Sequence, residues 1–453
     1  MPPSVDSLPT ESHTPSPPPP SSTLNPGVRR REVLGWALYD FANSGYTTVV
    51  ITAVFSAFFV GGVAQGASWA PLAWTFALSV SYALVMLTMP VLGAWCDRHG
   101  TKKRLLALTT SGCVLSTLAL GWVGPGDVAL GMLLIIASNT FYTIGESLIA
   151  AFLPELATGP GMGRVSGWGW ALGYVGGMLC LGLCLAYVLQ AQAKGEPAAS
   201  FVPVTLVITA LFYGGASLFT FAWLRDRGLP ASGGALSGGS SPMGQWQRLR
   251  QSLHRLKDYP ELARLLACIV AYQAGVAVAI TLAAIYAEQV MGFQPQETMV
   301  LIFALNIAAT VGAFSLGHAQ DRWGHQRTLA VTLVGWIITC VIVALAQTKP
   351  VFWGAAVLAG LCLGSSQSAG RAMAGLLTPP AQTAEFFGLW SFAVRAASIA
   401  GPLLYGLITW FTAGHQRLAI GATACFFMLG LWWLWPLDMA KGRARVTAPG
   451  ADR

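Results

Sequence analysis

Charged side chains are scarce in this sequence. They make up 10% of the 453 residues, whereas soluble globular proteins carry about 25%. A water-soluble surface relies on many interspersed charges, so the scarcity excludes an ordinary soluble protein.

The motifs of common enzymes are also missing. The chain has no Gly-x4-Gly-Lys-Ser/Thr loop, no His-Glu-x-x-His pair and no nucleophile elbow, so ATP hydrolysis, zinc proteolysis and serine hydrolysis lack their usual residues. We expect a protein that is not an enzyme and needs no cofactor. An intramembrane enzyme of another kind is the alternative left open.

Cysteine usage points away from a metal centre and from disulfides. The eight cysteines never occur as Cys-x-x-Cys and lie almost entirely within apolar stretches. Cys180 and Cys184 share a helical face, where small packing residues are the simpler explanation. We therefore predict neither a metal site nor a disulfide framework.

Long apolar runs are abundant instead. Hydrophobic residues make up 54% of the chain, and a helix needs about 20 of them in a row to cross a bilayer. Twelve such segments lie near 34–62, 71–95, 105–123, 128–153, 165–190, 201–224, 262–287, 297–319, 328–347, 350–377, 386–411 and 417–437. The sequence thus predicts an all-α membrane protein with twelve transmembrane helices.

Lysine and arginine placement predicts the orientation. When the loops are assigned alternately to two sides, 21 of the 26 basic residues fall on one side, and basic loops stay in the cytoplasm. Both termini are therefore expected in the cytoplasm, in the cell membrane or inner membrane if the source is bacterial. The net charge of +8 reflects this bias, so a lipid bilayer and not nucleic acid is the expected partner.

Composition also suggests five regions. Residues 1–32 form a Pro/Ser-rich tail predicted to be disordered, and 33–224 hold the first six helices. A linker at 225–261 combines a Gly/Ser stretch with a basic amphipathic helix that could lie on a membrane surface or in solvent. Residues 262–437 hold the other six helices, and 438–453 form a second cytoplasmic tail.

An internal repeat relates the two groups of helices. Gly93-Ala-Trp-Cys-Asp-Arg-His-Gly follows the second helix, and Gly317-His-Ala-Gln-Asp-Arg-Trp-Gly follows the eighth, 224 residues later. Two matches at equivalent places indicate a parallel repeat.

These motifs resemble the major facilitator superfamily, whose signature is G-x-x-x-D-R-x-G-x-K-K. Further motifs resemble its vacuole-effluxer-like branch, related to fungal autophagy-associated amino-acid exporters: Gly35-Trp-Ala-Leu-Tyr-Asp-Phe-Ala-Asn-Ser, Leu153-Pro-Glu-Leu, Gly163-Arg-Val-Ser-Gly and Ala384-Glu-Phe-Phe-Gly-Leu. The resemblance covers about 33–437 and implies two pseudo-symmetric six-helix bundles. Departures at Gly370, Trp390 and Arg395 bear on the substrate.

Polar stripes inside the apolar helices are candidates for substrate binding or coupling. An intramembrane charge costs about 2.5–3.5 kcal/mol to insert, so each one needs a partner or a task. The candidates are Asp40, Asn43 and Ser44 on helix 1, Glu146 on helix 4, Gln367 and Arg371 on helix 10, and Arg395 on helix 11. The four charges lie about 9–14 Å from the cytoplasmic ends of their helices at about 1.5 Å per residue.

Three roles for these charges stay open. The resemblance places helices 1, 4, 7 and 10 around a central cavity and so brings Asp40, Glu146 and Arg371 together. An acid could hold an ammonium and Arg371 a carboxylate, or the charges could pair across the halves and lock a cytoplasmic gate that protonation releases. Ion pairs fixed within each half are the alternative.

The two repeated loops are the candidate gates. Their residues are Gly93, Asp97, Arg98, Gly100, Lys102, Lys103, Asp321 and Arg322. By resemblance, each aspartate meets a helix N-terminus of the opposite half, where the helix dipole favours a carboxylate. A role in topology alone is the alternative.

The predicted function is secondary active transport of a small solute by alternating access. By resemblance the solute is an amino acid or related metabolite that is exported. We also expect proton coupling, through the intramembrane acids, and a monomer. A proton-coupled drug or sugar-like exporter, and a non-transporting sensor or scaffold, are the alternatives.

Overall fold

The computed structural model describes residues 23–227, 250, 254–412 and 415–447 and is almost entirely helical within them. Twelve of its described helices are long and apolar enough to cross a membrane, as the sequence predicts. Of the basic amphipathic helix predicted from 245 onward, 245–249 and 251–253 lie outside the described residues. In the described part a 3₁₀ turn at Leu256–Asp258 comes before the helix that begins at Pro260.

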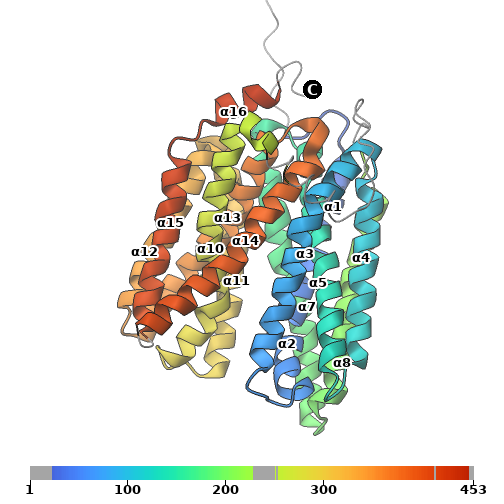
Figure 1. The fold of residues 1–453 in the computed structure, drawn as a ribbon, viewed down its shortest axis with the longest axis vertical. Coiled ribbons are helices and arrows are strands. Elements are labelled where there is room, and N and C mark those ends of the chain that lie inside the picture. The colour runs from blue at the N-terminus through green and yellow to red at the C-terminus, as the bar shows by residue number, and fades with distance from the viewer. Residues whose placement is uncertain (1–22, 228–249, 251–253, 413–414, 448–453) are drawn as a thin grey trace, which may run out of the picture.

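The first half of the chain forms one bundle, drawn in blue to green in Figure 1. Its first crossing continues from α1 through two π-helical segments, Thr47–Ala53 and Phe59–Val63. Its α-helices are α1 (Arg30–Tyr46), α2 (Phe55–Phe58), α3 (Ala70–His99), α4 (Lys102–Ala119), α5 (Val128–Ala150), α6 (Leu153–Leu156), α7 (Met162–Ala193) and α8 (Ala198–Trp223).

The second half forms the other bundle, drawn in yellow to red in Figure 1. Its α-helices are α10 (Pro260–Gln289), α11 (Pro295–Trp323), α12 (His325–Leu345), α13 (Lys349–Leu377), α14 (Thr383–Phe411), α15 (Gln416–Leu434) and α16 (Met439–Val446). Short 3₁₀ turns lie at Leu120–Trp122, Gly159–Gly161, Leu256–Asp258 and Pro380–Gln382. The two side-by-side bundles confirm the predicted major facilitator architecture.

The repeated loops turn at equivalent glycines. Gly100 ends α3 with φ +61°, and Gly324, which is 224 residues later, separates α11 from α12 with φ +94°. Only glycine adopts positive φ without a steric penalty. The internal repeat therefore places a glycine of positive φ in both turns, although ψ differs, at +39° for Gly100 and +143° for Gly324.

Both described ends of the chain lie at one end of the bundles, which we name the terminal face. There α1 begins and α16 ends the described chain (Figure 1). Close to the first described residue, Asn25 donates its backbone N–H to the Leu156 carbonyl (3.0 Å) and its side-chain amide to the Pro154 carbonyl (2.9 Å). The opposite end is the distal face.

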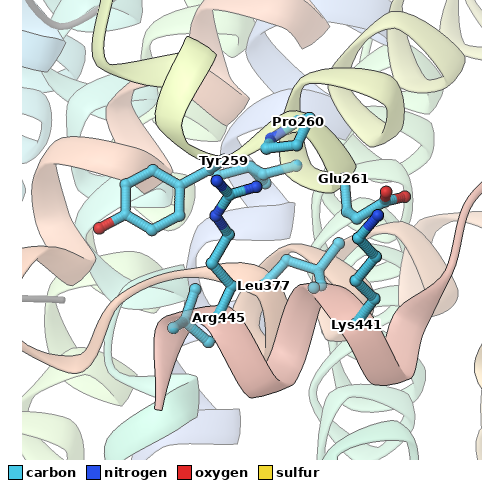
Figure 2. A pocket seen from close by; sticks show the side chains of 9 residues that line it. Tyr259, Pro260, Glu261, Leu377, Lys441 and Arg445 are labelled. Atoms are coloured by element: carbon cyan, nitrogen blue, oxygen red, sulfur yellow. The ribbon is translucent and has the colours of Figure 1, made fainter. Parts of the chain in front are cut away.

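The C-terminal helix α16 covers the start of α10. Figure 2 shows Arg445 and Lys441 rising from α16 toward Tyr259 and Glu261. The space enclosed between them is about 10 Å³, room for roughly one water molecule. This contact is packing and offers no room for a solute.

Small residues bring the halves together near the terminal face. Helix α3 packs along α14, and α7 packs along α11. Gly167 lies against the backbone of α11, and a Cβ there would be 2.5 Å from the Ala313 carbonyl oxygen and 3.1 Å from the Gly317 Cα. Such close backbone approach needs residues without side chains.

We predict that Gly167→Leu destabilises the folded chain by about 1–3 kcal/mol, the usual effect of overpacking. The added side chain must push α7 away from α11. Thermal unfolding of the detergent-solubilised chain measures the change. Gly215→Leu on α8 is the matched control because its added Cβ meets nothing within 4 Å; an equal effect of both substitutions would contradict the prediction.

Candidate substrate pathway and gates

Two ion pairs cross between the halves inside the membrane-spanning helices. Arg371 Nη1 on α13 lies 2.7 Å from Asp40 Oδ2 on α1, and Arg395 Nη2 on α14 lies 2.5 Å from Glu146 Oε2 on α5. In each pair the acid comes from the first half and the base from the second. Each pair therefore joins the two bundles.

Arg371 is held on every side. Its Nε donates to Ser166 Oγ (3.2 Å) and its Nη2 to the Ser166 carbonyl (2.9 Å). The guanidinium lies over the rings of Trp36 and Trp170, 4.7 and 5.2 Å from their centroids. Cation–π contacts gain strength away from water, so this arginine is firmly positioned.

Arg395 has a looser environment. Its guanidinium lies 5.3 Å from the ring centroid of Tyr82 on α3. Its Nε is buried and has no hydrogen-bond partner in the described part of the chain. The Nε–H group of this guanidinium is thus unused.

Among the described residues, the other predicted binding residues make no side-chain hydrogen bond to either ion pair, except for Ser44, which bonds the backbone of Asp40. Ser44 donates its hydroxyl to the Asp40 carbonyl (2.7 Å) within α1. Asn43 is buried nearby. Gln367 on α13 accepts a hydrogen bond from Gln273 on α10 (2.6 Å), and Gln273 is not among the residues predicted from the sequence.

Two sequence expectations need correction. Glu146 does not share Arg371 with Asp40; it pairs with Arg395, because α5 packs beside α14. The alternative of ion pairs confined to each half is wrong for all four charges, since both bonds cross between the bundles.

Two aspartates latch the halves together at the terminal face. Asp97, at the end of α3, accepts the backbone N–H groups of Ala384 (3.0 Å) and Glu385 (2.9 Å) in the first turn of α14. Helix N-termini have unpaired N–H groups and a positive dipole end. The carboxylate satisfies both features from the other bundle.

The second latch repeats this arrangement with the halves exchanged. Asp321, at the end of α11, accepts the backbone N–H groups of Gly163 (3.1 Å) and Arg164 (3.3 Å) in the first turn of α7. The Arg164 side chain adds an ion pair at 3.3 Å. Both aspartates thus lie where the resemblance places them, and their gating role stays a prediction.

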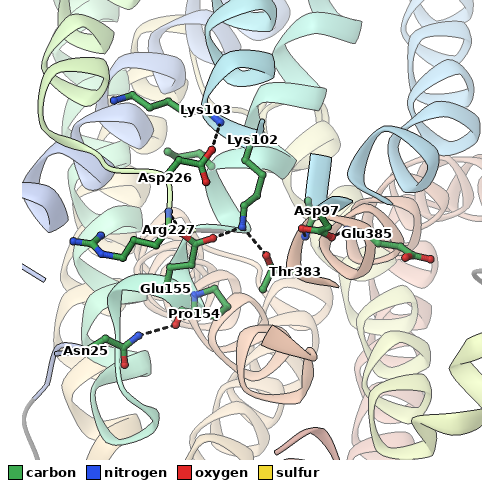
Figure 3. A network of polar contacts seen from close by, with 12 residues as sticks. Asn25, Asp97, Lys102, Lys103, Pro154, Glu155, Asp226, Arg227, Thr383 and Glu385 are labelled. Carbon is green, nitrogen blue, oxygen red and sulfur yellow. Dashed lines mark hydrogen bonds and ion pairs between the residues drawn. The ribbon is translucent and has the colours of Figure 1, made fainter. Parts of the chain in front are cut away.

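A polar network surrounds the first latch (Figure 3). Lys102 is buried and pairs with Glu155, which lies in α6, while it donates to Thr383 Oγ1 of the second half at 2.9 Å. Glu155 also accepts the backbone N–H of Arg227 (3.3 Å). Lys102 therefore connects the loop before α7 to the start of α14.

The remaining gate candidates have different positions. Lys103 donates its backbone N–H to Asp226 (3.1 Å) and its Nζ to the Leu224 carbonyl (2.6 Å), so it ties α4 to the end of α8. Within the described residues, the side chains of Arg98 and Arg322 make no hydrogen bond or ion pair. Gly93 packs directly on the Ala384 carbonyl, which lets Asp97 reach its two N–H groups.

Sequence reasoning missed three partners for a common reason. Ser166, Tyr82 and Thr383 are ordinary polar residues in apolar or loop contexts, and only the packing of the two halves gives them a partner. No cluster of three or more His, Cys, Asp or Glu side chains that could hold a metal ion is found among the described residues.

The two latches lie at the terminal ends of their helices, and the two ion pairs lie deeper in the bundles. Arg371 is about 9 Å from the end of α13, and Arg395 about 18 Å along α14 from its start, at about 1.5 Å per residue. In this structure the terminal face is therefore closed by two latches and two ion pairs.

Comparison with known proteins identifies the family. The model of the family described as "Vacuole effluxer Atg22 like" matches residues 56–447. The chain belongs to this family.

Individual relatives agree with the family. The chain is 28% identical to the MFS-type transporter YxiO of Bacillus subtilis (strain 168) over 87% of its own length and 92% of the relative. It is 23% identical to autophagy-related protein 22-1 of Penicillium rubens over 87% and 79%. The chain is thus a multi-pass membrane protein of a family of secondary transporters and is not an enzyme.

A solved structure supports the fold. The proton:xylose symporter XylE has a TM-score of 0.70 at 13% identity, covering 90% of this chain and 95% of that one. This likeness confirms the major facilitator fold.

We predict that Asp97→Ala releases the first turn of α14. The Ala384 and Glu385 amides have no partner within their helix and should exchange with solvent at least tenfold faster in hydrogen–deuterium exchange. Asp127→Ala is the control, since Asp127 accepts the Gly124 N–H (3.0 Å) within one loop at the distal face. Unchanged exchange of both amides in Asp97→Ala would show that the latch does not protect them.

Proposed function

We propose that this chain is a proton-coupled exporter of an amino acid or related metabolite that works by alternating access. The observation that carries the proposal is the pair of acid–base bridges between the halves, Asp40–Arg371 and Glu146–Arg395. A carrier of this fold opens one side by rocking its halves apart. That motion must break both bridges, so whatever breaks them controls the transport cycle.

The terminal face is the cytoplasmic one in this proposal. Basic residues gather there, and basic loops are retained in the cytoplasm. They include Arg29–Arg31 before α1, Lys102–Arg104 after α3 and Arg443–Arg445 in α16. The closed terminal face then separates the two bridges from the cytoplasm.

A proton can act on either bridge. Protonation of Asp40 or Glu146 would remove the negative charge that holds its arginine, and a broken bridge would then leave only one charge to be stabilised. Breaking a buried ion pair is otherwise strongly unfavourable. The structurally similar XylE is a proton:xylose symporter, so this fold is compatible with proton coupling.

The substrate class and direction rest on the family and on the charges. The matching family is described as an effluxer, and the sequence motifs resemble autophagy-associated amino-acid exporters. An acid and a base at the same site suit the ammonium and carboxylate of an amino acid. A sugar or a neutral drug would leave these four charges without a role in recognition.

We predict that the purified chain in proteoliposomes moves at least one of the twenty standard L-amino acids, driven by an imposed pH difference. Asp40→Asn and Arg371→Ala should each reduce the pH-driven rate at least tenfold, because each removes one partner of a bridge. Glu297→Gln is the control, since its pair with Lys349 (2.6 Å) is largely exposed near the distal face and such pairs contribute little.

The outcomes separate the candidate functions. Flux of a sugar or cationic dye in place of every amino acid would favour the drug or sugar-like exporter. No substrate-dependent flux of any kind would favour a sensor or scaffold. Unchanged pH-driven flux in both bridge variants would contradict the role proposed for the charges.

A further inference from the structure

The two ion pairs between the halves differ in how far their side chains are exposed. Within the Asp40–Arg371 pair the side chains are 10% and 3% exposed, whereas within the Glu146–Arg395 pair they are 20% and 12% exposed. The second pair is therefore the one that a small solute can reach more easily.

Arg371 has no free edge for a ligand. Its Nε and Nη2 are used by Ser166, and its Nη1 by Asp40. A carboxylate ligand prefers two parallel N–H groups of one guanidinium, so binding here would first require α7 to release Ser166. This bridge is built to join three helices.

Arg395 and its neighbours have unused polar atoms. Arg395 Nε, Ser391 Oγ and Thr143 Oγ1 are buried, and none has a hydrogen-bond partner among the described residues. Ser391 precedes Arg395 by one turn of α14, and Thr143 precedes Glu146 by one turn of α5, so each hydroxyl shares a helical face with a member of the bridge. Buried polar atoms without partners are uncommon.

Thr140 Oγ1 on α5 also has no hydrogen-bond partner among the described residues, but other hydroxyls on the same two helices do. Ser398 on α14 donates to the Val394 carbonyl (2.9 Å), and Ser147 on α5 donates to the Thr143 carbonyl (2.9 Å). These serines are satisfied by their own helix, as is common for hydroxyls within helices. Ser391 and Thr143 could be satisfied in the same way but are not.

Depth does not separate the two bridges. Arg395 lies about 18 Å along α14 and Arg371 about 9 Å from the end of α13, at about 1.5 Å per residue. Their acid partners reverse this order, because Asp40 lies about 15 Å along α1 and Glu146 about 6 Å from the end of α5. Both bridges lie between the two repeats, where carriers of this kind bind substrate.

The need to keep the charges of the site balanced favours a zwitterionic ligand. An amino acid can insert into the bridge with its carboxylate on Arg395 and its ammonium on Glu146, so one ion pair becomes two and the net charge of the site is unchanged. An anion or a cation alone would leave one buried charge unpaired, which is costly. A neutral solute would gain nothing from either charge.

We propose that Arg395, Ser391, Glu146 and Thr143 form the substrate head-group site, with Arg395 and Ser391 binding the carboxylate and Glu146 and Thr143 the ammonium of a zwitterion. The inference rests on the proposed amino-acid transport and assigns its recognition step. Arg371 and Asp40 then serve the closure of the terminal face and not the contact with substrate.

The test uses the full chain in proteoliposomes and the standard L-amino acid that the wild-type chain exchanges fastest. Exchange of internal for external amino acid is measured for Ser391→Ala, Thr143→Val and Arg395→Lys, with Ser398→Ala as the matched control on α14. The first three should raise the half-saturating concentration about tenfold or more, the usual effect of losing a hydrogen bond to a charged group. Ser398→Ala should stay within twofold of the wild type.

Arg371→Lys supplies the contrast. It should slow net pH-driven transport while leaving the half-saturating concentration for exchange within threefold. Two competitors complete the assay with the wild-type chain: the N-acetyl derivative, which lacks the ammonium, and the amide, which lacks the carboxylate. Both should compete at least tenfold more weakly than the parent amino acid.

Each possible result decides a separate point. Absence of amino-acid exchange in the wild-type chain overturns the proposed function itself. Normal exchange together with unaltered half-saturation in Ser391→Ala, Thr143→Val and Arg395→Lys overturns the assignment of the site but leaves the function standing. A tenfold rise in Arg371→Lys alone would move the head-group site to the other bridge.

Discussion

The cost of placing a charge in a medium of low dielectric constant shapes this molecule. A charge near the centre of a membrane is tolerated only when it is paired, and here each paired charge has its partner in the other bundle. Neither half could bury these side chains alone without an unpaired charge. Closing the terminal face and satisfying the charges are therefore the same event.

The latches apply the same principle at the surface of the bundles. Each terminal aspartate satisfies the N–H groups of a helix that belongs to the other half, so the helix start is complete only when the halves touch. Small residues such as Gly167 permit the close backbone contact that this geometry needs. The repeated sequence motif makes the two latches nearly equivalent, as expected for a carrier built from two related halves.

The fold could be predicted from sequence because it follows from local patterns. Twelve apolar runs and the repeat around Asp97 and Asp321 depend on residues close together in the chain, and the structure confirms the resulting architecture.

The candidate site could be predicted only in part. The four intramembrane charges stand out in the sequence because they interrupt apolar helices. Which base each acid meets was not predictable, because Glu146 and Arg395 are 249 residues apart and their contact depends on how α5 packs against α14. Ser166 and Tyr82 were missed since nothing in their local sequence marks them as partners of an arginine.

The two bridges, Asp40–Arg371 and Glu146–Arg395, hold the halves together on the side of the terminal face. Double electron–electron resonance measures the distance between spin labels on cysteines that replace His99 and Arg327, one exposed position in each half. The exposed Cys425 is first replaced by serine, so that it is not labelled. If the two bridges hold the halves together, the wild-type chain should give a single distance, and a second, longer population should appear when Asp40→Asn and Glu146→Gln are combined. An unchanged distance distribution in the combined variant would contradict it.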